Sequence, residues 1–157
     1  MSNRIYIAAA NQHVGKTTIT LGVIAKLRQK FAKVGYCKPV GQIFVETPAG
    51  RVDKDVVVAS EYLKFNVNPS LHSPVIIGPG VVNEFIDAPK PHQFSQAISQ
   101  AQQRIDSLHD FVVYEGTGHP GVGGVIGVSN AQVAKQLQAG VILVVEAGVG
   151  RTIDSNI

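Results

Sequence analysis

The sequence has little cysteine, no tryptophan and no long apolar run. The single cysteine, Cys37, excludes an internal disulfide and favours a reducing compartment. No stretch reaches the roughly 18 apolar residues that a membrane-spanning helix needs. Met1 and the three residues after it lead directly into a predicted strand, so we expect no signal peptide. We therefore expect a cytoplasmic protein that does not bind membranes.

Positively and negatively charged residues are also nearly balanced in number. Lysine and arginine number 14 against 11 acidic residues, which gives a net charge of +3 and a pI of about 9.1. A mild basic cluster within residues 26–33 is typical of a solvated helix face, and we favour that interpretation over a nucleic-acid patch. With 157 residues, 45% of them hydrophobic, the chain is long enough for one globular domain over residues 1–157.

Apolar patterns along the chain alternate between strand-like and helix-like. Strands are predicted at 4–9, 34–40, 111–115 and 141–145, the last two buried, with a short edge element at 74–77. Helices are predicted at 17–33, 53–65 and 94–108. A capping box at Ser129 predicts a further helix that runs to about Gln138. Segment 53–65 also suits a strand, and 41–52 and 116–127 are predicted loops. Val- and Ile-rich strands that alternate with helices predict an α/β fold, a doubly wound and mostly parallel sheet.

The most informative motif follows the first predicted strand. The spacing from Ala10 to Gly15-Lys16-Thr17 is that of a phosphate-binding P-loop, with alanine in the first glycine position. Glycine lets backbone N–H groups approach phosphate oxygens, the lysine reaches the β- and γ-phosphates, and the threonine offers its hydroxyl to Mg²⁺. We expect ATP to contact Asn11, Gln12, His13, Val14, Gly15, Lys16, Thr17 and Thr18, with the side chain of His13 facing solvent.

Further polar residues fall where predicted strands end. In open parallel sheets ligands bind at the carboxyl ends of the strands. Because Mg²⁺ prefers one or two carboxylates together with phosphate and water, Thr17, Asp55 and Glu115 form a candidate metal set. Lys38 is a candidate second cation beside the γ-phosphate, so Lys16 and Lys38 are the candidate catalytic residues.

Each of these residues has a structural alternative. Lys38 precedes a proline and could be a solvated surface residue, and Asp53 could serve only as a helix cap. Glu115 follows four apolar residues, where a buried acid needs a partner. His119 could touch substrate, although loop histidines are usually not catalytic. No His/Cys pair has metal-ligand spacing.

Together these motifs resemble the dethiobiotin synthetase family of P-loop proteins, over nearly the whole chain. The stretches that carry the resemblance are Asn11–Thr17, Gly35–Val40, Asp55 and Val112–Gly116. Two longer stretches are similar to the synthetase-like ATPase domain at the N-terminus of phosphotransacetylase-type proteins, namely Glu115–Gly124 and Val128–Ala131.

The resemblance implies a doubly wound P-loop NTPase that uses ATP and Mg²⁺ and is often a homodimer with the substrate at the interface. In the synthetase a diamine takes up CO₂ as a carbamate, ATP phosphorylates the carbamate, and ring closure expels phosphate. Carried over, Lys16 and Lys38 would stabilise the phosphoryl group while Thr17, Asp55 and Glu115 hold Mg²⁺. The alternative is a nucleotide-sensing regulatory domain with little or no catalysis, as in phosphotransacetylase-like proteins.

Related partition ATPases have a second lysine at the position of Asn11, and its absence argues against that branch. Two departures from the synthetase pattern stand out. The loop after Glu115 is longer and contains His119-Pro120. The stretch Gly148–Asp154 resembles the entry to a further helix, which predicts a chain truncated at its C-terminus and lacking its base-recognition segment. We accordingly expect exposed apolar surface near 141–145, through which the chain self-associates or pairs with a partner.

Overall fold

A central parallel sheet organises the molecule. The computed structural model describes residues 3–12, 14–90 and 92–146. Four strands lie in the order β2-β7-β1-β8, and all of their pairings are parallel. Their bounds are β2 Val34–Cys37, β7 Phe111–Glu115, β1 Arg4–Ala9 and β8 Gly140–Val144. At the centre of the sheet Ile7 lies opposite Glu115, so the carboxyl ends of β1 and β7 meet at one edge.

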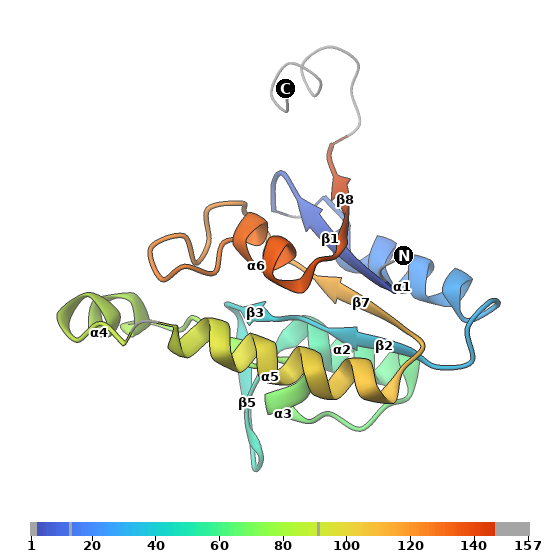
Figure 1. The fold of residues 1–157 in the computed structure, drawn as a ribbon, viewed down its shortest axis with the longest axis horizontal. Helices are drawn as coiled ribbons and strands as arrows, with labels where there is room; N and C mark the ends of the chain where they lie inside the picture. The colour runs from blue at the N-terminus through green and yellow to red at the C-terminus, as the bar shows by residue number, and fades with distance from the viewer. Residues whose placement is uncertain (1–2, 13, 91, 147–157) are drawn as a thin grey trace.

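Helices cover both faces of this sheet (Figure 1). One face packs against α1 (Lys16–Leu27) and α2 (Lys54–Leu63), and the other against α5 (Gln93–Leu108) and α6 (Asn130–Leu137). The first core contains Ile7 and Ile24, whereas the second contains Ile105. This architecture confirms the predicted α/β class with a doubly wound parallel sheet.

Strand β8 forms where it is predicted, but all of it except Val144 is exposed. Val141, Ile142 and Leu143 are 58%, 38% and 49% exposed. The cause is the position of the strand at the edge of the sheet, where β1 is its only neighbour among the described residues. The prediction of a buried strand at 141–145 is therefore wrong, since an apolar sequence does not reveal whether a strand is central or lies at an edge.

The segment predicted as a loop at 41–52 contains three short strands. The first, β3 (Val40–Gly41), pairs in parallel with β6 (Val75–Ile76), which confirms the edge element at 74–77. The others, β4 (Phe44–Thr47) and β5 (Gly50–Asp53), form an antiparallel hairpin that projects from the sheet in Figure 1. The turn of the hairpin is closed by Gly50, whose φ of 124° is one that glycine adopts readily.

Two short helices were not predicted, and one helix is shorter than predicted. The two unpredicted helices are α3 (Pro69–His72), which begins at a proline, and α4 (Val81–Asp87), which follows a stretch rich in proline and glycine. Helix α1 ends at Leu27 rather than near Lys33, because the chain turns there toward β2. Within the described residues, every helix is too short or too polar to cross a membrane.

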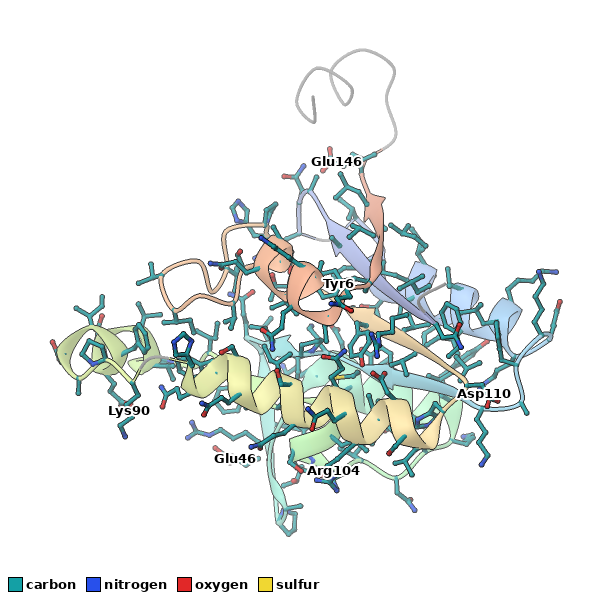
Figure 2. All side chains as sticks on the ribbon, in the orientation of Figure 1. Tyr6, Glu46, Lys90, Arg104, Asp110 and Glu146 are labelled. Atoms are coloured by element: carbon teal, nitrogen blue, oxygen red, sulfur yellow. The ribbon has the colours of Figure 1, made fainter. Side chains whose placement is uncertain are left out.

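Helix α6 begins as its sequence predicts and is tied to the centre of the sheet. The side chain of Ser129 accepts from the backbone of Gln132, and the side chain of Gln132 accepts from the backbone of Ser129, which completes a capping box. Beneath this helix the hydroxyl of Tyr6, labelled in Figure 2, donates to Asn130 Oδ1 at 2.9 Å. The predicted helix entry at Gly148–Asp154 lies outside the described residues.

Candidate nucleotide site

The loop between β1 and α1 has the backbone geometry of a phosphate cradle. Ala10 N donates to Val144 O at 3.1 Å, and the chain then turns into α1 at Gly15 with φ 81°. No atom lies within 4 Å of a Cβ placed on Gly15, so its backbone conformation, rather than space, requires glycine. No side chain caps α1, which leaves its first-turn N–H groups for an anion.

A cavity of about 410 Å³ opens at this helix end. It is lined by six of the predicted nucleotide contacts, namely Asn11, Gln12, Gly15, Lys16, Thr17 and Thr18. Val14 packs against the core on the α1 face instead, and His13 lies outside the described residues. The sequence interpretation missed Gln42, Ile43, Lys54 and Gly118, which also line the cavity; the first two belong to the segment taken for a loop.

Beneath the cavity Lys16 and Thr17 share one acceptor. Lys16 Nζ forms an ion pair with Glu115 Oε1, and Thr17 Oγ1 donates to the same oxygen at 2.7 Å. Lys16 is buried and Glu115 is 0% exposed. Glu115 thus has the partner that its position after four apolar residues requires, and two of the predicted metal ligands are in direct contact.

The other oxygen of Glu115 is held by a residue that sequence reasoning missed. Tyr36, on β2, donates its hydroxyl to Glu115 Oε2 at 3.0 Å. Burial first, and then the nearby Glu115 carboxylate, raise the pKa of Tyr36 well above its usual value, so the phenol stays protonated and acts as a donor. The sequence does contain a signal for this residue. Tyr36 lies two residues before Lys38, and side chains two residues apart along an extended strand lie on the same face.

A second ion-pair cluster lines the same cavity. Lys38 Nζ contacts Asp53 Oδ1 at 2.9 Å and also contacts Asp55 Oδ2. Burial alone would lower the pKa of Lys38, but the charges of Asp53 and Asp55 outweigh it and raise the pKa, so the side chain is a cation. The solvated alternative for Lys38 is wrong, because this lysine is only 6% exposed.

The comparison with known families agrees with this geometry. A family model described as an AAA domain (AAA_26) matches residues 3–157. The chain belongs to the dethiobiotin synthetase-like family of P-loop proteins. It is accordingly a P-loop ATP-binding domain, and its family includes ATP-dependent ligases such as dethiobiotin synthetase.

The donor set of this family member fits a magnesium ion that is held mainly by phosphate and water. The oxygens of Thr17 and Glu115 lie 2.7 Å apart, close to the roughly 2.9 Å that separates neighbouring ligands around Mg²⁺. Asp55 lines the same cavity and contacts Lys38, with its side chain 35% exposed. Among the described residues, no three His, Cys, Asp or Glu side chains gather into a metal-binding group.

The long glycine-rich loop of this family member is anchored behind the site rather than open. Asn130 Oδ1 accepts from Thr117 N at 2.9 Å and from Thr117 Oγ1 at 3.0 Å. A Cβ on Gly118 would lie 3.0 Å from the side chain of Gln12, so this loop packs closely on the P-loop. His119 is exposed, accepts from Gly121 N at 3.2 Å and does not line the cavity, which favours its role as a loop side chain.

Proposed function

We propose that this domain binds ATP with Mg²⁺ and transfers the γ-phosphoryl group to a carboxylate or carbamate for ring or amide formation. An oxygen of the acceptor attacks the γ-phosphorus, the bond to the β,γ-bridging oxygen breaks, and ADP leaves with that electron pair. The acyl or carbamoyl phosphate so formed then reacts with an amine and releases phosphate. The family includes ligases that depend on ATP, which supports this reaction class.

The observation that carries the proposal is that two buried lysines line one cavity. Lys16 and Lys38 are 7% and 6% exposed, and each has a carboxylate partner in this structure. Regulatory nucleotide binding needs one P-loop lysine, whereas phosphoryl transfer gains from a second cation where negative charge develops. The carboxylate partners orient both ammonium groups until phosphate replaces them.

Thr17 and Glu115 are the residues that would hold Mg²⁺ most directly, with Asp55 as the third candidate ligand. When bound there, Mg²⁺ would supply positive charge that offsets part of the negative charge of the phosphate groups. Glu115 is suited to this role because its Oε1 already lies beside the Thr17 hydroxyl at 2.7 Å. Asp55 lines the cavity and would have to exchange its contact with Lys38 for the metal or for water.

Replacement of the P-loop lysine tests nucleotide binding. Lys16→Ala removes a charge-assisted phosphate contact of about 1.5–3 kcal/mol, so the affinity for ATP should fall about tenfold to a hundredfold. Lys26→Ala is the matched control, because Lys26 is an exposed lysine of the same helix. Calorimetry on variants that keep the wild-type circular dichroism spectrum gives the affinities. Equal affinities for both variants would contradict a P-loop site.

Release of phosphate separates the two function classes. A ligase of this family should release phosphate from ATP faster when 7,8-diaminopelargonate and bicarbonate are present, and Lys38→Ala should remove the stimulation. Tight binding of nucleotide without stimulated release by these or by other amine and carboxylate pairs would instead support the regulatory alternative, a nucleotide-sensing domain of a phosphotransacetylase-like protein.

A further inference from the structure

The two carboxylate oxygens of Glu115 have different partners on different elements. Oε1 accepts from Lys16 Nζ and Thr17 Oγ1, both on α1, whereas Oε2 accepts from the Tyr36 hydroxyl at 3.0 Å. The carboxylate is fully buried at 0% exposure, and Tyr36 is 3% exposed. Oε1 thus contacts two residues that line the nucleotide cavity, whereas Oε2 contacts a residue of the neighbouring strand.

The partners on α1 are the ones that a bound nucleotide would take. Under the proposed function, the ammonium of Lys16 contacts phosphate and the hydroxyl of Thr17 contacts the metal. Of the three described donors to Glu115, only Tyr36 then keeps its contact with the carboxylate. A buried carboxylate that has lost its other donors depends strongly on the one that remains.

Tyr36 is well fixed for this task. It lies on β2, which pairs with β7, and it is opposite Val113, two residues before Glu115. Its ring packs near that of Phe65, with 6.2 Å between the ring centroids. Because adjacent strands and a packed ring hold the hydroxyl, the direction of Oε2 is set by the sheet rather than by the P-loop.

We propose that Tyr36 is a positioning residue that holds Glu115 Oε2, so that Oε1 alone is presented to the metal and Mg²⁺ is favoured over Ca²⁺. This inference rests on the proposed function. Mg²⁺ requires near-ideal octahedral geometry, which suits a carboxylate that offers one oxygen. Ca²⁺ is larger, takes more ligands and readily accepts both oxygens of one carboxylate, as a freely rotating glutamate would allow.

The test compares Tyr36→Phe with the wild type by calorimetry, using the β,γ-imido analogue of ATP in Mg²⁺, in Ca²⁺ and in EDTA. The loss of a hydrogen bond to a charged group should reduce the gain in affinity from Mg²⁺ about tenfold. The affinity in EDTA and the gain from Ca²⁺ should stay near the wild-type values. The preference for Mg²⁺ over Ca²⁺ should therefore fall about tenfold.

Tyr114→Phe is the matched control. It removes another buried phenol from the same sheet, whose hydroxyl donates to Asp106 at 3.1 Å rather than to Glu115. If Tyr36 had only a structural role, Tyr36→Phe and Tyr114→Phe would show the same gain in nucleotide affinity from Mg²⁺. In a Glu115→Gln background, Tyr36→Phe should cause no further loss of the Mg²⁺ gain, because the two residues then act through one carboxylate.

The outcomes separate this inference from the proposed function. A wild-type protein that gains no affinity from Mg²⁺ overturns both. A wild-type gain with equal values for Tyr36→Phe and Tyr114→Phe overturns only the role of Tyr36. If Tyr36→Phe fails to fold, the wild-type protein alone tests the inference. An equal gain in nucleotide affinity from Ca²⁺ and from Mg²⁺ would then show that Glu115 is not restricted to presenting Oε1.

Discussion

Two aspartates contact Lys38, and their surroundings differ sharply. Asp53 is 1% exposed; its Oδ1 accepts from Lys38 Nζ and from Asp55 N, and its Oδ2 accepts from Gln42 N. The side chain of Asp55 is 35% exposed and is oriented toward the cavity. Asp53 therefore does more than cap α2, because it also holds Lys38 and the chain that leads into the β4–β5 hairpin.

We expect Asp53→Asn to destabilise the fold and Asp55→Asn to leave it nearly unchanged. The amide of asparagine would place a donor against Lys38 Nζ or Gln42 N, at a cost of about 2 kcal/mol in the free energy of unfolding. Asp55→Asn should change that free energy by only about 0.5 kcal/mol, as expected for a partly exposed site. Urea denaturation of both variants gives the two values.

The same pair of variants distinguishes the metal candidates. Asp55→Asn should weaken Mg²⁺-dependent nucleotide binding while Asp53→Asn, where it stays folded, should not. A reversed result would mean that Asp53 is the ligand and that the buried ion pair with Lys38 opens when nucleotide binds.

At the scale of elements, α6 shows how a short helix depends on its first turn. It spans Asn130–Leu137, and Asn130 also anchors Thr117 in the glycine-rich loop. A short helix gains little from its own backbone bonds, so its capping box and the packing of Val133 and Leu137 must hold it. Loss of the capping hydrogen bonds at Ser129 should therefore also loosen the glycine-rich loop that Asn130 anchors.

Ser129→Ala should lower the free energy of unfolding by about 1 kcal/mol, which corresponds to about 2–4 °C in Tm for a chain of this size. Ser107→Ala is the control, since Ser107 is exposed near the end of α5 and its hydroxyl donates only to Arg104 O among the described contacts. Thermal unfolding followed by circular dichroism measures both. Equal shifts would show that the capping box contributes nothing specific.

Elements with strong local signals are the ones that the sequence predicts. The P-loop spacing, the capping box at Ser129 and the strand Phe111–Glu115 each depend on a few neighbouring residues, and the structure places all three as predicted. The β4–β5 hairpin was missed because Pro48 and Gly50 suggest a loop, although the strand-forming residues on either side of that turn pair with each other. Helix α3 is too short for any periodic signal.

Contacts between segments that are far apart in the chain have no local signal, so the sequence does not predict them. Tyr36 and Glu115 lie on β2 and β7, far apart in the chain, and only the strand order makes them neighbours. The same applies to Asp53, whose role as a partner of Lys38 depends on the turn through β3 and β5. Residue types and strand ends thus predict which residues gather at the site, but not which of them pair.

At the scale of the whole molecule, helices cover both faces of the sheet, whereas among the described residues no further strand covers its β8 edge. Val141 and Leu143 pair with Tyr6 and Ala8 and therefore lie on the α6 side of the sheet. There they help to line a mostly apolar cavity of about 520 Å³ between β8 and α6. Together with Ile142, they form an exposed apolar strip along an edge strand, a feature that commonly promotes association of chains.

We expect this chain to self-associate through the β8 edge. A second copy would bury the side chains of Val141 and Leu143 and pair with the outer side of β8, where the described residues provide no strand. Leu143→Lys removes an apolar contact of about 1.5–3 kcal/mol and adds a charge to the edge, so the dissociation constant should rise about tenfold or more. Val58→Lys is the control, because Val58 is equally exposed at 50% but lies on α2, over the opposite face. Sedimentation velocity at micromolar concentrations measures both variants. A wild-type protein that stays monomeric throughout, or a Val58→Lys variant that dissociates as readily as Leu143→Lys, would contradict association through β8.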